Sequence, residues 1–171
     1  MKSRFFYLFS LSLKKVTPFF ITVFMVIITV TPVHIPGYPG IVPLLTLASI
    51  FHWAVYKPEL LPTYAVFLLG LLQDLLHGIP IGVNAAVFLL VYGGITSQSR
   101  FFFKKSFPII WVGFGIVLAI SCFLTWSLMS MLNATIIDPA PLYLEYLVTL
   151  GCYPAIAWTL LRWQRLVLSQ V

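Results

Sequence analysis

Long apolar runs, separated only by short turn-rich breaks, are the feature that most restricts what this chain can fold into. Hydrophobic residues make up 61% of its 171 residues, and charged residues make up only 8%. A soluble domain of this length could not bury so much apolar surface. Because the runs are continuous rather than alternating, the sequence predicts an all-α integral membrane protein.

Six of these runs are candidate membrane-spanning helices. They cover residues 18–33, 40–56, 61–77, 83–96, 107–132 and 142–161. The second and fourth runs are short, so we expect them to be irregular or buried within the bundle, where protein can satisfy their backbone. The pattern predicts a single six-span membrane domain over residues 1–171, whose residues 1–16 form a basic cytoplasmic or interfacial segment.

The ten basic residues all fall on one side of this predicted topology. They precede the first span, follow the second, fourth and sixth, and comprise Lys2, Arg4, Lys14, Lys15, Lys57, Arg100, Lys104, Lys105, Arg162 and Arg165. Positive residues flank the cytoplasmic ends of membrane helices, so both termini are expected in the cytoplasm and the chain in the inner (plasma) membrane. The net charge of +6 then reflects topology and predicts no nucleic-acid partner.

Motifs of known intramembrane chemistry are absent from the sequence. There is no H-E-x-x-H zinc motif and no G-x-S-x-G nucleophile motif. His34, His52 and His77 lie on different segments, and we expect them at membrane interfaces with a ring edge in water. The sequence therefore predicts a protein that is not an enzyme, with no catalytic residue, metal or cofactor.

One acidic residue, Asp74, lies inside the apolar stretch "GLLQDLLHGIPIGVNA" with no lysine or arginine nearby. An intramembrane acid suggests a function, so a catalyst, a proton or ion site, a packing element and a helix end near water are all open. On a helix, Gly70, Asp74 and Gly78 lie on one stripe, and small residues at this spacing let another helix approach closely. This pattern favours packing, with the Asp74 carboxyl bonded to backbone groups of a neighbouring helix.

The residues after His77 predict a tight outer hairpin between the third and fourth spans. Gly78 and Gly82 permit left-handed dihedrals, Pro80 stiffens the turn, and Asn84 is expected to cap the next helix. Asp74, one turn below, would tie the hairpin together. The structural or partner-docking candidates are therefore Gly70, Asp74, Gly78, Pro80, Gly82 and Asn84.

The stretch from His52 to Tyr92 resembles the MreD family of bacterial rod shape-determining proteins. The resemblance rests on an ordered series: the turn Lys57-Pro58-Glu59, Gly70 with Asp74, and Gly78-Ile79-Pro80-Ile81-Gly82 followed by Asn84 and Ala85. The later segment "SQSRFFFKKSFPIIWVGFG" is similar to the family's loop into its fifth span.

This resemblance implies a non-enzymatic scaffold of the cell-wall elongation complex, which regulates cell shape and peptidoglycan synthesis. The implied partners are the lipid bilayer, an MreC-like membrane protein with one span and, indirectly, an MreB-like cytoskeleton and a RodA-like glycosyltransferase with its transpeptidase. The resemblance also implies a fold similar to the substrate-binding subunits of energy-coupling-factor transporters, which says nothing firm about a ligand.

A second hypothesis is a small-molecule or lipid binding or transport subunit that uses a pocket between helices near the outer face. Polar groups would have to converge there, and Asp74, Asn84, His34 and Glu145 are the available ones. The resemblance favours the scaffold, and the short loops and the lack of catalytic motifs agree with it.

Overall fold

The structure, a computed structural model, describes residues 17–29, 33–35, 38–102 and 105–168, without the side chains of 33–35, 38–41, 99–102 and 166–168. The basic segment expected over residues 1–16 lies outside these described residues.

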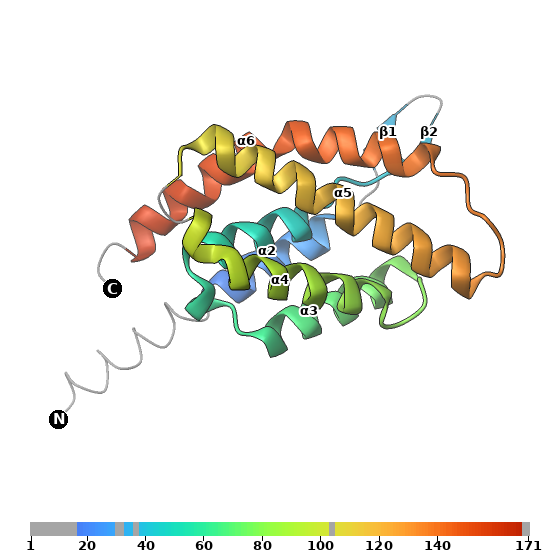
Figure 1. The fold of residues 1–171 in the computed structure, drawn as a ribbon, viewed down its shortest axis with the longest axis horizontal. Helices are drawn as coiled ribbons and strands as arrows, with labels where there is room; N and C mark the ends of the chain where they lie inside the picture. Colours follow the sequence, from blue (N-terminus) through green and yellow to red (C-terminus); the bar gives the residue numbers. More distant parts are fainter. Residues whose placement is uncertain (1–16, 30–32, 36–37, 103–104, 169–171) are drawn as a thin grey trace.

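Helices account for nearly all of the described chain (Figure 1). An N-terminal helix covers Thr17–Thr29. It is followed by β1 (Val33–Ile35), β2 (Tyr38–Ile41), α2 (Leu45–Tyr56), the 3₁₀ helix η1 (Pro58–Leu60), α3 (Thr63–His77), α4 (Val83–Phe102), α5 (Phe107–Leu132) and α6 (Ala140–Leu168). The prediction of a helical protein is confirmed, and α5 has the expected bounds.

The first two predicted spans are shorter than expected, because a strand pair lies between them. β1 and β2 are antiparallel, with Val33 opposite Ile41. Pro39 and Pro43 have no backbone N–H and restrict the residues before them to extended conformations, so a helix cannot run through this segment. α2 therefore begins at Leu45 rather than near Gly40.

The fourth helix is longer than expected, since α4 continues to Phe102 instead of ending near Thr96. Where the predicted span ends, two hydroxyl groups donate to carbonyls of the preceding helical turn. Thr96 donates to the Tyr92 carbonyl and Ser97 to the Gly93 carbonyl, both at 2.8 Å. The polar residues that follow the apolar part of α4 therefore do not end this helix, because their hydroxyl groups can bond within it.

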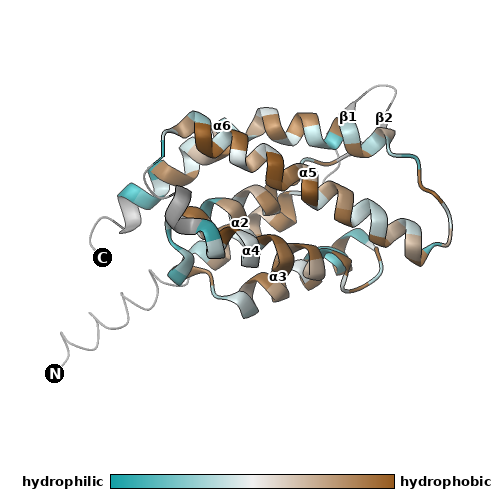
Figure 2. Ribbon diagram, in the orientation of Figure 1, coloured by the Kyte–Doolittle hydropathy of each residue, from teal (hydrophilic) through white to brown (hydrophobic). Residues whose placement is uncertain are grey.

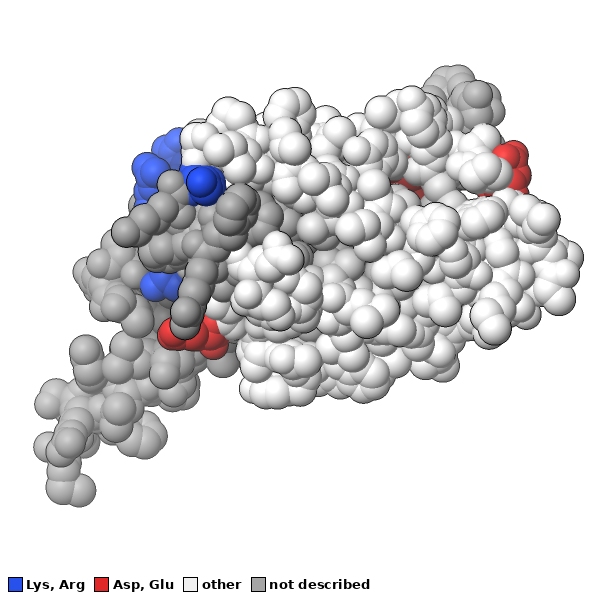
Figure 3. Space-filling model, in the orientation of Figure 1, with Lys and Arg blue, Asp and Glu red and all other residues white. Residues whose placement is uncertain are grey.

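The connections between helices gather at two opposite ends of the bundle (Figure 1). One end holds η1, the α4–α5 connection and the end of α6, and the other holds β1–β2, the α3–α4 turn and the α5–α6 loop. The four basic residues with described side chains, Lys57, Lys105, Arg162 and Arg165, belong to the first, which we term the basic end. Figure 3 shows blue side chains only there on the face in view, and Figure 2 shows brown apolar residues along the helices between the ends.

α2 forms the centre of the bundle. It contacts α4, α5 and α6, and every residue from Thr46 to Val55 is buried. The predicted burial of the second span is thus confirmed. The Phe51 ring packs edge-on against Phe114 (5.2 Å between centroids), and Phe114 stacks on Tyr153 at 4.0 Å.

The burial of α2 corrects the expectation for His52. Its side chain is fully buried, next to the side chain of Gln164. The ring also packs against Trp53 and Tyr56. A helix at the centre of a bundle is covered on all sides by protein. His52 therefore has no contact with water, although it lies near the end of the predicted span.

Two helices, α5 and the Ala140–Arg165 part of α6, are long and apolar enough to cross a membrane. The other apolar helices are shorter: Thr17–Thr29, α2, α3 and the Val83–Gln98 part of α4. α2, with 12 residues, is about 18 Å long at about 1.5 Å per residue, against a hydrocarbon core of about 30 Å.

Candidate functional site

Asp74 lies near the end of α3 and is fully buried. Its carboxylate accepts two backbone hydrogen bonds, from the N–H of Gly82 at 2.7 Å and from the N–H of Asn84 at 2.9 Å. Both donors lie across the turn, at the start of α4. The carboxylate therefore ties the two arms of the α3–α4 hairpin together, as the sequence suggested.

α3 ends after His77 because Gly78 adopts a left-handed conformation, with φ of 65°. Its N–H donates to the Asp74 carbonyl, and the N–H of Ile79 donates to the same oxygen at 3.2 Å. This is the usual glycine-terminated helix end, in which following N–H groups satisfy the last carbonyls. Asp74 therefore contributes its backbone to the end of one helix and its side chain to the start of the next.

The start of α4 is capped by a residue from a different helix. The first N–H groups of a helix have no partner within it, and an anion near them is also favoured by the helix dipole. Asp74 supplies that acceptor, and Asn84 lies inside the first turn. The expectation that Asn84 caps α4 is therefore corrected, because the Asp74 carboxylate occupies its N–H.

Gly70 lies at a close approach of α3 to α4. A Cβ atom built on Gly70 would lie 2.4 Å from the Cα of Ala85 and 2.7 Å from its nitrogen. Only glycine permits this approach, because both clashing atoms belong to the backbone of α4. Gly70 and Asp74 of the predicted stripe thus face the next helix of the same chain, but Gly78 does not, because it lies beyond the end of α3.

Gly82 has φ of 106°, a conformation that side chains rarely adopt. We expect Gly82→Ala to lower the free energy of unfolding by about 1–2 kcal/mol, because a left-handed backbone is costly for a residue with a Cβ. Thermal unfolding in detergent measures the change. Gly151→Ala is the matched control, since a Cβ there would have no neighbour within 4 Å and the residue sits inside a regular helix. Equal stability of both variants would contradict the assigned strain.

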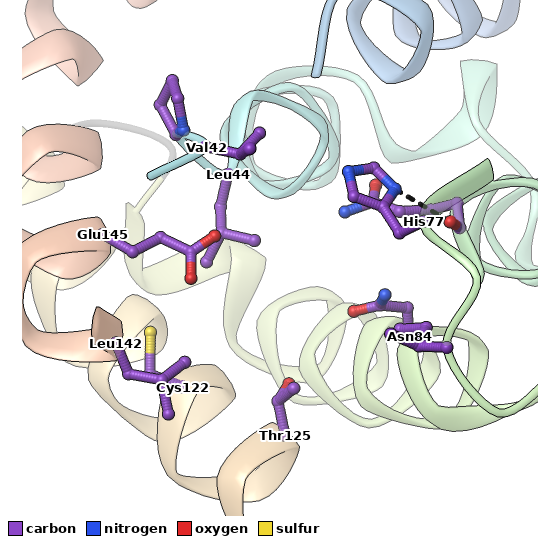
Figure 4. A pocket seen from close by; sticks show the side chains of 11 residues that line it. Val42, Leu44, His77, Asn84, Cys122, Thr125, Leu142 and Glu145 are labelled. Carbon is purple, nitrogen blue, oxygen red and sulfur yellow. Dashed lines mark hydrogen bonds between the residues drawn. The ribbon is translucent and has the colours of Figure 1, made fainter. Parts of the chain in front are cut away.

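The remaining polar candidates lie around a pocket beside the hairpin, drawn in Figure 4. Asn84 and Glu145 both line it, as do Gln73 and His77. Asp74 does not, because both of its oxygens face the α4 backbone. His34 lies on β1, outside the described side chains.

Sequence reasoning missed Gln73, Cys122 and Thr125 as lining residues of this pocket. Gln73 carried a usable signal, since it adjoins Asp74 within an apolar helix. The pairing of α3 with α5 and α6 around one pocket depends on tertiary packing and left no local mark. Cys122 and Cys152 are free and half-buried.

The fold and the site define the class of protein. It is a helical bundle with apolar helices, a carboxylate used to cap a helix, and, over the described residues, no cluster of three metal-ligating side chains. A comparison with models of protein families matches residues 10–160 to the family described as rod shape-determining protein MreD. The chain belongs to this family of membrane proteins involved in rod-shape determination, which is not a known enzyme family.

No curated protein and no solved structure matches the chain. The expected similarity to the substrate-binding subunits of energy-coupling-factor transporters therefore finds no support in these comparisons.

Proposed function

We propose that the chain is a non-enzymatic, six-span subunit of the cell-wall elongation complex in the plasma membrane, with both termini in the cytoplasm. The described basic residues at one end support this orientation, since such residues flank the cytoplasmic side. The outward faces of the helices are apolar: Phe20, Tyr64, Leu68, Leu75, Ile116 and Trp158 are each more than half exposed. Lipid or a partner helix would cover such faces.

The observation that carries a docking role is a groove between α4 and α5. The groove has a volume of about 440 Å³, and Leu90, Ile95, Ile116 and Ile120 line its apolar walls. Gly94 lies in it, and nothing occupies the space where a side chain on Gly94 would be. Helices associate in lipid by close packing at small residues, so this groove suits a single apolar helix.

We assign that helix to the membrane span of an MreC-like partner, which links the chain to the MreB-like cytoskeleton and the RodA-like synthase. Gly70, Asp74, Gly78, Pro80, Gly82 and Asn84 contribute indirectly, by fixing α4 against α3. The full burial of Asp74 supports this indirect role over direct contact with the partner.

Co-purification with an MreC-like partner tests the docking face. We expect Gly94→Leu to reduce the retained partner roughly tenfold or more, because a side chain would fill the groove and prevent close approach. The matched control is Gly151→Leu, which places the same side chain on an exposed position of α6. Loss of the partner in both variants, or in neither, would contradict the assignment of this face.

A further inference from the structure

The pocket beside the hairpin combines polar side chains from several helices with apolar walls. It has a volume of about 180 Å³ and lies between α3, α4, α5, α6 and the segment before α2. In Figure 4, the carboxylate of Glu145 and the amide of Asn84 face the same space from opposite sides, and the His77 ring borders it. The volume is below the 300–1,000 Å³ common for drug-sized ligands, so a small group fits it.

One residue that lines this pocket, Gln73, carries an unsatisfied polar atom. Gln73 is only 3% exposed, yet its side-chain oxygen has no hydrogen-bond partner among the described residues. Asn84 is 7% exposed and borders the same pocket. Buried polar groups are nearly always paired, so the Gln73 oxygen indicates a partner supplied from the pocket.

Two acceptor groups from different helices line the pocket. Glu145 contributes two carboxylate oxygens and Gln73 its unpaired side-chain oxygen, and no lysine or arginine is among the described residues that line the pocket. A hydrogen-bond donor with positive charge would satisfy both groups.

We propose that this pocket binds a primary ammonium group, with the Glu145 carboxylate as its counter-ion and the Gln73 oxygen as a second acceptor. An ammonium has three donors and no acceptor, so it can bond to both the Glu145 carboxylate and the Gln73 oxygen. A bare metal ion fits less well, because the described residues contain no cluster of three charged or imidazole ligands and Leu44 and Leu142 form apolar walls.

The ammonium belongs either to a free small amine or to an aminophospholipid headgroup. An apolar groove of about 430 Å³ between α5 and α6 adjoins the pocket and shares Cys122 and Leu142 with it. Phe123, Trp126 and Tyr143 also line this groove, which would hold an attached hydrocarbon chain. The proposal does not depend on the docking of an MreC-like partner.

Native mass spectrometry of the detergent-purified protein tests the site. Phosphatidylethanolamine, phosphatidylcholine of the same chains, and ethanolamine alone are the probes. We expect wild type to retain phosphatidylethanolamine about tenfold better than phosphatidylcholine, whose trimethylated nitrogen has no N–H to donate. If millimolar ethanolamine displaces the lipid, the ammonium group alone is sufficient for binding to the pocket. If it does not, binding also requires the hydrocarbon chain of the lipid.

Three variants control the interpretation. Glu145→Gln should abolish the preference for the ethanolamine headgroup, while Glu59→Gln, an exposed acid in η1 near the basic end, should retain it. Gln73→Leu should weaken the preference without loss of folding, because it removes an unpaired buried oxygen. Equal retention of both lipids by wild type, or a preference that survives both Glu145→Gln and Gln73→Leu, would overturn the proposal.

Discussion

Asp74→Leu should destabilise the protein by roughly 2–6 kcal/mol, because one buried and one half-buried N–H group would lose their acceptor at about 1–3 kcal/mol each. These donors are the N–H groups of Gly82 and Asn84. Leucine also removes the negative charge at the start of α4, where the helix dipole favours an anion. The thermal unfolding midpoint in detergent, compared with wild type, measures the effect.

Asp74→Asn should be intermediate between wild type and Asp74→Leu. The amide keeps one oxygen to accept from Gly82 or Asn84, but its NH₂ group must face the other N–H donor. The order wild type, asparagine, leucine thus follows the number of acceptors. If leucine were tolerated as well as asparagine, the carboxylate would not be the clamp of this hairpin.

Gly70→Ala should destabilise by at least about 3 kcal/mol, at the upper end of what overpacking costs. The new Cβ would lie 2.4 Å from the Cα of Ala85, so α3 and α4 must separate for it to fit. No flexible side chain can move aside, since the neighbouring atoms are backbone. Thermal unfolding and co-purification yield both report the change.

Gly93→Ala provides the control for this substitution. Gly93 is also a helical glycine, but a Cβ added there would have no neighbour within 4 Å. Alanine favours a helix over glycine by about 1 kcal/mol, so this variant should be equally or slightly more stable. A loss of stability in Gly93→Ala as large as that in Gly70→Ala would show that the close approach of α3 and α4 is not the cause.

The parts of the fold that local pattern controls could be predicted from the sequence. The apolar run of α5 has the same bounds in sequence and structure, since it is long and flanked by clear breaks. The spacing of Gly70 and Asp74 was sufficient to place them on one face of α3, whereas Gly78, predicted on the same stripe, lies just beyond the end of the helix. A carboxylate in an apolar helix needs hydrogen-bond donors. The pattern therefore also predicted that Asp74 would bond across the hairpin, as it does to the N–H of Gly82.

The parts that tertiary contacts control could not be predicted. The capping of α4 by Asp74 rather than by Asn84 depends on how closely the helices pack, which Gly70 sets. His52 looked interfacial because sequence position does not reveal that α2 is central. Likewise, nothing in the sequence placed Gln73 beside Glu145, because they lie on α3 and α6.

The central claim is that the chain acts by docking a partner helix. The most direct test compares the shape of cells that contain different variants at the same abundance in the membrane. Cells in which Gly94→Leu replaces the native chain should lose their rod shape although the variant is present in the membrane at wild-type level. Cells with Gly151→Leu should remain rods. If cells whose only copy of the protein is the Gly94→Leu variant kept their rod shape, the account would be contradicted, because the α4–α5 groove would then be dispensable.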